Sequence, residues 1–215
     1  PVSVASLVQV GALQAERLGE AGPQAAEPLL AAKALPLLVW QLGAMLEAED
    51  PQGTAQLARA LAALTSCGPS FQEATLKVGG MRMLVAAVNW EASLDAATVA
   101  AAAINNLVAG NQEAKNKLRV ESGLDALVEF MRRAVAAGDA FAVGSAATAL
   151  RNAITHNNGN REEVTKLDAV KICIVCICRY CNYEECTVQL LALLNNLFSD
   201  NPPAKEQMVE NQGMQ

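Results

Sequence analysis

The residues best suited to chemistry are six cysteines, and five of them lie within the stretch KICIVCICRYCNYEEC at positions 171–186. The stretch contains the pattern C-x-x-C twice, as Cys173 with Cys176 and as Cys178 with Cys181. This spacing occurs in zinc sites, in iron–sulfur proteins and in redox-active dithiols. It therefore raises the hypothesis of a metal or redox module.

The surroundings of these cysteines favour a buried helix face instead. Zinc-binding C-x-x-C motifs form a turn, whereas these cysteines are embedded among isoleucines and valines. On a helix, Cys176 lies roughly 60° to one side of Cys173. Cys178 and Cys181 lie roughly 140° and 80° to the other side, and thiols spread over about 200° cannot close around one ion. Because free cysteine packs as a small hydrophobic residue, we predict core thiols and no metal site.

Other groupings that catalyse reactions are missing from the sequence. The single histidine, His156, lies in the loop ITHNNGN without a neighbouring serine or cysteine nucleophile. The G-x-S-x-G elbow is absent, and Gly79–Gly80 lack the lysine and Ser/Thr of a phosphate-binding loop. The adjacent glutamates at 162–163 and at 184–185 point to different helix faces. We predict that the chain is not an enzyme, with no catalytic residue and no cofactor.

Charge and composition argue against several kinds of partner. The net charge of −6 disfavours nucleic acid, because proteins that bind it neutralise phosphates with Lys and Arg. The densest basic cluster, AKNKLRV, places Lys115 and Arg119 on one helix face, which we interpret as solvated. No run approaches the roughly 18 apolar residues needed to span a bilayer, and no secretory signal is recognisable. We therefore expect a cytoplasmic protein with reduced thiols and no membrane or nucleic-acid partner.

The elements that position these residues belong to an internal repeat. Four segments each close an apolar helical run before a loop of Gly, Asn, Asp or Pro: ARALAALTSCGPS, AAAINNLVAGNQE, TALRNAITHNNGN and LALLNNLFSDNPP. The closing residues are 43, 47 and 43 positions apart, with a fainter copy 46 positions upstream: Leu18, Leu64, Leu107, Ile154 and Leu197. A small residue follows each closing residue after 16 positions: Ala34, Gly80, Gly123 and Gly213, with Ala169 or Val170 in the fourth copy.

This pattern predicts three helices in each unit: a short one, a medium one after the small residue, and a long one that ends at the closing residue. The segments AAKALPLLVWQL, RVESGLDALVEFM, AAAINNLVAGNQEAKNKL and ALLNNLFSDNPPAKEQMVENQGM resemble the armadillo family, and the resemblance covers essentially the whole chain. It implies an all-α fold, a right-handed α-solenoid of armadillo-type three-helix repeats. HEAT repeats, usually with two helices per unit, are the structural alternative.

We expect one solenoid over residues 1–215, built from approximate units at 1–20 (partial), 21–66, 67–109, 110–156, 157–199 and 200–215 (partial). Solenoids need polar capping units, and none is evident at either end of the sequence. The chain is therefore expected to be part of a longer solenoid or a larger complex.

The armadillo resemblance implies that the third helices line a concave groove that binds a partner. The family's recurring groove residue is an asparagine just before the closing leucine, a slot that holds Asn106 and Asn196, with Ala63 and Ala153 elsewhere. We predict a groove formed by Asn105, Asn106, Arg151, Asn152, Asn195 and Asn196. Side-chain amides suit an extended peptide because each can both donate to and accept from its backbone. The alternative is that these asparagines cap carbonyls near their own helix ends.

Armadillo proteins that carry nuclear import signals place a tryptophan four residues before this asparagine. Here those positions hold Arg59, Ala102, Ala149 and Ala192, which argues against basic import peptides. The two tryptophans, Trp40 and Trp90, fall on second helices, where we expect them to pack. We predict a non-enzymatic scaffold or adaptor for a protein partner. The alternatives are a passive architectural segment of a cytoskeletal or ciliary assembly and, less favoured, a metal or redox module.

Overall fold

The structure, a computed structural model, describes residues 4–31 and 33–212, and this part of the chain contains fourteen α-helices and no strand. The helices are α1 (Val4–Glu20), α2 (Pro23–Ala31), α3 (Ala34–Glu47), α4 (Pro51–Ser66), α5 (Pro69–Lys77), α6 (Gly80–Asn89), α7 (Leu94–Val108), α8 (Gln112–Val120), α9 (Gly123–Ala137), α10 (Ala140–Ile154), α11 (Asn158–Lys166), α12 (Ala169–Tyr180), α13 (Glu184–Phe198) and α14 (Pro202–Gln212). The small residue predicted at Gly213 lies outside the described residues.

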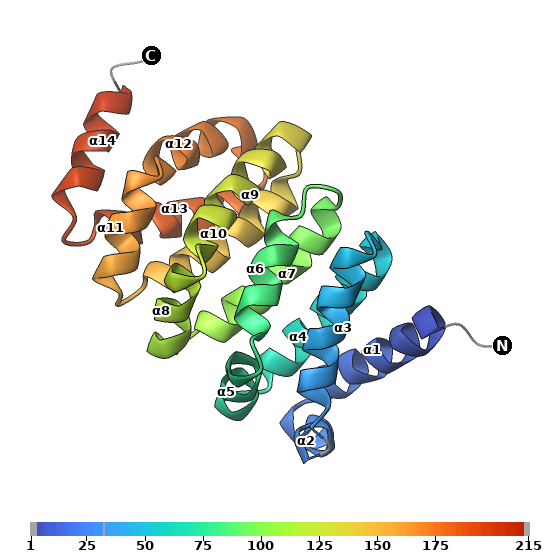
Figure 1. Ribbon diagram of the computed structural model, residues 1–215. Helices are drawn as coiled ribbons and strands as arrows, with labels where there is room; N and C mark the ends of the chain where they lie inside the picture. Colours follow the sequence, from blue (N-terminus) through green and yellow to red (C-terminus); the bar gives the residue numbers. More distant parts are fainter. Residues whose placement is uncertain (1–3, 32, 213–215) are drawn as a thin grey trace.

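Each unit has a short first helix followed by two longer ones, and the third is longer than the second except in the unit of α9 and α10, where both have 15 residues. This arrangement confirms the all-α solenoid of three-helix units. In Figure 1 the long third helices α1, α4, α7, α10 and α13 follow one another in one layer, and the second helices α3, α6, α9 and α12 lie side by side in front of it. Each third helix contacts the third helix of the next unit, so the chain is held together by contacts between neighbouring units.

Alanine makes the close stacking of third helices possible. Ala58, Ala101 and Ala147 occupy the same position on α4, α7 and α10, and each is fully buried. Larger side chains fill the space between the layers, and Phe130 and Leu107 are among the largest that are fully buried. Each such side chain contributes about 1.5–3 kcal/mol through burial.

A left-handed backbone residue marks the junction between the first and second helix of every unit. These residues are Lys33, Gly79, Ser122 and Asp168, with φ between 55° and 80°. The next residue must be small where the helices approach, because a Cβ added at Gly123 would collide with Leu118 and Val85. In the fourth unit Asp168 precedes Ala169, which is 1% exposed. The small residue of that unit is therefore Ala169 rather than Val170.

The third helices also correct the register of one unit. Helices α7, α10 and α13 each have 15 residues, so their first and last residues correspond directly. This alignment matches Ala153 with Leu107 and Leu197, and it matches Asn152 with Asn106. The sequence pattern had aligned Ile154 instead, one residue too far, because Ile154 is the larger apolar residue. Ala153 is nevertheless fully buried, and it closes the helix in place of a leucine.

In three of the units, a polar side chain on the first helix binds the carbonyl end of the third helix in the same unit. The donors occupy the fourth position of α5, α8 and α11: Gln72 to the Asn106 carbonyl at 2.8 Å, Lys115 to the Thr155 carbonyl, and Arg161 to the Ser199 carbonyl at 2.6 Å. These bonds satisfy carbonyls that the end of a helix leaves unpaired.

This arrangement overturns the expectation that Lys115 and Arg119 form a solvated face. Lys115 is only 3% exposed, and burial lowers the pKa of its ammonium group. Arg119 donates to the Oδ1 atom of Asn160, which lies on α11 in the next unit. Both cations therefore take part in packing between helices. The sequence analysis missed this because their partners lie about 40 residues further along the chain.

Within the described residues, no single helix is long and apolar enough to cross a membrane. Only α2 and α3 taken together reach that length and hydropathy, and these two helices are bent by 84° relative to each other.

Candidate functional site

The cysteine stretch forms helix α12, the second helix of the fourth unit. Cys173 and Cys176 correspond to Leu127 and Phe130 of α9, and all four side chains are buried. Burial raises the pKa of the Cys173 thiol and raises that of Cys176 to about 12, so neither is readily available as a thiolate.

The two pairs of cysteines do not converge on one site. Cys178 and Cys181 are exposed, whereas Cys173 and Cys176 are buried. Among the residues that the structure describes, no three histidine, cysteine or acidic side chains form a group able to hold a metal ion. The prediction of core thiols is confirmed for Cys173 and Cys176, and it is wrong for Cys178 and Cys181, which lie on the exposed side of the same segment.

His156 occupies a loop position that requires a left-handed backbone. Its φ is 53°, and Gly110 and Asp200 take the same conformation after α7 and α13. Histidine, asparagine and aspartate are among the residues that adopt this region more readily than most. The His156 carbonyl accepts a hydrogen bond from the Nε2 atom of Gln112 at 3.1 Å. The backbone thus accounts for this residue without a catalytic partner.

Three of the six predicted groove residues form a ladder between third helices, which we call the asparagine ladder: Asn106, Asn152 and Asn196. The corrected register places all three at the same position of their helices. Each Nδ2 donates to the preceding third helix or its C-cap: to the Ala62 carbonyl at 2.8 Å, to Asn105 Oδ1 at 2.7 Å, and to Thr155 Oγ1 at 2.9 Å. The ladder therefore bonds one unit to the next rather than capping its own helix ends.

The other three predicted groove residues differ from one another. Asn105 accepts the bond from Asn152, and the Nη1 atom of Arg151 donates to Gln189 Oε1 at 2.9 Å. Asn195 is exposed. The structure thus brings Asn105, Asn106 and Asn152 into one hydrogen-bonded chain, while Asn195 lies apart from it. A role for any of the six in binding a partner stays a prediction.

The same face carries a cleft that the sequence pattern did not predict, which we call the α7–α10–α13 cleft. It measures about 680 Å³ and runs across α10, with walls from α7 and α13. The residues that line it include Ala102, Asn105, Phe141, Gly144, Ser145, Thr148, Glu184, Glu185, Val188 and Gln189. Phe141 is 74% exposed although it is a large aromatic side chain. An exposed phenylalanine at the second position of a third helix was the signal that could have revealed the cleft.

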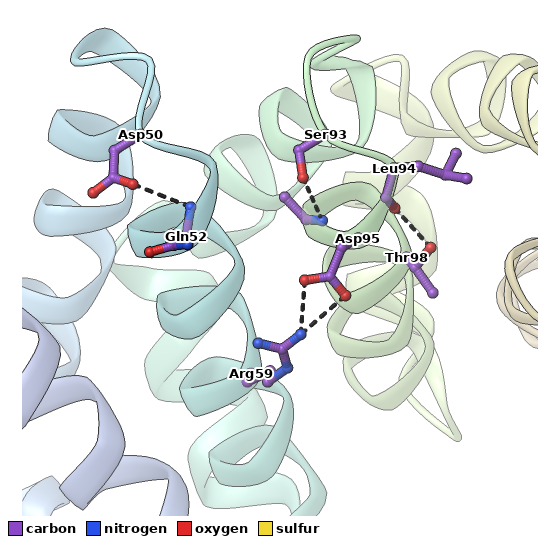
Figure 2. Close-up of polar contacts among 8 residues, drawn as sticks. Asp50, Gln52, Arg59, Ser93, Leu94, Asp95 and Thr98 are labelled. Carbon is purple, nitrogen blue, oxygen red and sulfur yellow. Dashed lines mark hydrogen bonds and ion pairs between the residues drawn. The ribbon is translucent and has the colours of Figure 1, made fainter.

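We call the contact between two successive third helices a joint. At the preceding joint, between α4 and α7, the positions equivalent to Ala102 and Phe141 carry an ion pair. Figure 2 shows Arg59 of α4 reaching Asp95 of α7, with Nη2 at 2.9 and 2.8 Å from the two carboxylate oxygens. Arg59 corresponds to Ala102 and Asp95 corresponds to Phe141.

The corrected register also replaces Ala149 with Thr148 at the position where armadillo proteins that carry nuclear import signals have a tryptophan. That slot therefore still contains no tryptophan.

Trp40 does not pack as expected. It is 69% exposed on α3, and Leu37, one turn earlier, is 55% exposed. Trp90 is partly buried, and its carbonyl accepts a hydrogen bond from Arg133 Nη1 at 3.2 Å. The residues equivalent to Trp40 on α6 and α9 are Ala86 and Glu129, so the fold does not require an aromatic side chain there.

Comparison with solved structures shows an armadillo-type repeat fold. A designed armadillo repeat protein in complex with the peptide (KR)4 is 21% identical, with a TM-score of 0.80, over 94% of this chain and 80% of that chain. Computationally designed armadillo repeat proteins for modular peptide recognition are 21% identical, with a TM-score of 0.83, over 99% of this chain and 84% of the other. A further designed armadillo repeat protein is 20% identical, with a TM-score of 0.83, over 98% and 84% of the two chains.

No protein-family model matches the chain, and no curated protein matches its sequence. The similarity to solved structures therefore establishes the fold alone.

Proposed function

We propose that this chain is a non-enzymatic scaffold that binds a protein partner along the exposed surface of α4, α7, α10 and α13, here called the third-helix face. One observation supports this proposal above the others, namely the α7–α10–α13 cleft with its exposed Phe141. A concave site that combines apolar area with a few polar groups is the usual form of a binding site.

The structural neighbours support the same proposal. Two of them bind or were designed to recognise peptides, and this chain shares their fold over most of its length. A cytoplasmic, reducing location belongs to the proposal as well, and it is supported by the six cysteines, all of which are unpaired.

A display selection tests the proposed face directly. A random peptide library is selected on the immobilised chain, and binders are then measured on Ala102→Arg and on the control Val120→Arg. Arginine is tolerated at the position of Ala102, because Arg59 occupies it in the preceding unit. Val120 is 79% exposed on the first helix α8 and does not line the cleft. We expect Ala102→Arg to weaken most binders at least tenfold and Val120→Arg to leave them unchanged; equal effects of the two substitutions would contradict the proposal.

The exposed Leu37 and Trp40 favour a second candidate, an architectural segment that makes its contacts through α3. Tryptophan is enriched among the residues that dominate binding energy at interfaces. The same selection separates the two candidates, because binders lost on Trp40→Ala but kept on Ala102→Arg would place the binding surface on α3.

A further inference from the structure

We infer that the α7–α10–α13 cleft binds a peptide segment that presents one bulky apolar side chain next to lysine or arginine. The inference rests on the proposed function, since it specifies the chemistry of the partner on the third-helix face. Its basis is the set of groups in the cleft that a ligand can reach, namely the Phe141 ring and the carboxylates of Glu184 and Glu185.

Phe141 provides a large exposed apolar surface in the cleft. The sister positions on α4, α7 and α13 hold Gln52, Asp95 and Glu185, all polar and all exposed. The fold therefore accepts a polar side chain here and gains nothing from an exposed phenyl ring. Large exposed aromatic side chains beside a hollow are typical anchors for a partner.

The floor of the cleft is made of small residues that leave room beside this ring. Ala102 stands where the preceding unit has the long side chain of Arg59, and Gly144 packs closely against α13. A Cβ added at Gly144 would lie 3.5 Å from the Cα atom of Cys186. Val188 closes the opposite wall and is 51% exposed. A bulky apolar side chain of the ligand fits between Phe141 and Val188, where it would remove both from water.

Most polar groups in the cleft already have partners within the protein. Ser145 Oγ donates to the Thr98 carbonyl at 3.3 Å, and Thr148 Oγ1 donates to the Gly144 carbonyl at 2.8 Å. Asn105 Oδ1 and Gln189 Oε1 each accept a bond from a neighbouring helix. These side chains therefore shape the surface more than they select a ligand.

The free charges of the cleft are two carboxylates. Glu184 and Glu185 form the first turn of α13 beside Phe141, and among the described residues neither takes part in an ion pair. Their charge is complementary to lysine or arginine, and acidic peptides would be repelled. An apolar anchor flanked by a cation matches both features of the cleft at once.

Defined peptides test this chemistry. Fluorescein-labelled decapeptides contain one Phe and two adjacent Lys in a Gly/Ser background, with the Lys pair one to four positions before or after Phe. Matched peptides carry Ala in place of Phe, or Glu in place of Lys. Fluorescence anisotropy at about 0.05 M and 0.5 M salt measures binding to the full chain and to three variants: Phe141→Gln, the double variant Glu184→Gln/Glu185→Gln, and the control Val120→Gln, at an exposed position of α8 outside the cleft.

We expect at least one Phe–Lys arrangement to bind, and both matched peptides to bind at least tenfold more weakly. Phe141→Gln places the sister residue of α4 in the cleft and should weaken binding at least tenfold. The glutamine pair should weaken binding at low salt several-fold and remove most of the salt dependence. Val120→Gln should leave affinity within twofold. The inference fails if no Phe–Lys peptide binds, if the Glu peptides bind equally well, or if Phe141→Gln has no effect.

Such a failure remains distinct from failure of the proposed function. If library peptides are lost on Ala102→Arg but do not depend on Phe141 or the glutamates, the third-helix face binds a ligand of other chemistry. If no library peptide responds to Ala102→Arg, the proposed function fails together with this inference.

Discussion

The joint between α4 and α7 and the joint between α7 and α10 place the same backbone positions opposite each other, yet they expose different chemistry. At the first joint Arg59 and Asp95 form an ion pair that spans the two helices. At the second, Ala102 and Phe141 occupy those positions and leave a cleft. The asparagine ladder is present at both joints, so helix spacing is kept while two side chains decide what the surface can bind.

The second helices α9 and α12 show the same principle inside the core. Leu127 and Phe130 of α9 are replaced by Cys173 and Cys176 on α12, and both pairs are fully buried. A smaller and softer side chain thus occupies the same place in the solenoid. At Cys173 and Cys176 the C-x-x-C spacing coincides with two core positions of the second helix.

The largest expected effect concerns the reactivity of these thiols. Cys178 and Cys181 are exposed and should react with N-ethylmaleimide at the rate of a free thiol. Cys173 and Cys176 should react at least about a hundredfold more slowly, because labelling of buried groups requires opening of the structure. Time-resolved labelling followed by tandem mass spectrometry measures each site separately. Equal rates for all four cysteines would show that α12 does not bury the side chains that α9 buries.

The two buried thiols, Cys173 and Cys176, should make the protein less stable at alkaline pH. Burial raises the pKa values of the Cys173 and Cys176 thiols above their ordinary value of 9.0, to about 12 for Cys176. The folded protein therefore retains protons that the unfolded chain releases above pH 9.0. The stabilisation is complete below that pH and decreases as pH rises toward 12. Urea unfolding across this range should show the decline in the native chain and less of it in Cys173→Val/Cys176→Val.

The next largest effect tests whether the difference in side chains between the two joints controls binding. The double variant Ala102→Arg/Phe141→Asp transfers the ion pair of the first joint to the second. We expect it to fill the cleft and weaken the peptides selected on the native chain at least tenfold, about 1.4 kcal/mol. Binding is measured by anisotropy, and thermal unfolding checks that the fold is retained. Unchanged affinity would mean that the chemical difference between the joints has no role in binding.

The sequence was sufficient to predict the repeat because loops and helix junctions obey local rules. Left-handed residues, small residues at close contacts and apolar runs recur in every unit. The register of the unit at 110–156 was predicted one residue too far because Ala153 stands where its sisters have leucine. The burial of Lys115 was missed because its carbonyl partner belongs to another helix.

The cleft was not predicted for a related reason. It combines the small Ala102 with the large Phe141, 39 residues later, and the sequence does not show that these two positions lie side by side. The asparagine positions were predictable from their resemblance to armadillo repeats. Their bonding between units was not, since it depends on which atom of the preceding helix lies within reach.

A smaller effect concerns the asparagine ladder, which the two joints share. Asn152→Ala removes the donor to Asn105 Oδ1 and should lower the free energy of unfolding by about 1 kcal/mol. Asn195→Ala, at an exposed position of α13, should change it by less than about 0.5 kcal/mol. Urea unfolding followed by circular dichroism measures both. If the two substitutions have the same effect, the asparagine ladder does not contribute to the spacing of the third helices.

The smallest expected effect concerns the ion pair that distinguishes the first joint. Arg59 and Asp95 are 41% and 64% exposed, so water and salt screen their attraction. A double-mutant cycle of Arg59→Ala and Asp95→Ala should give a coupling energy of about 0.2–1 kcal/mol, which falls at about 0.5 M salt. A larger, salt-independent coupling would show that the pair fixes the packing of α4 against α7. A small coupling means that either joint can exchange its pair of side chains without loss of the fold, so units can acquire different surfaces independently.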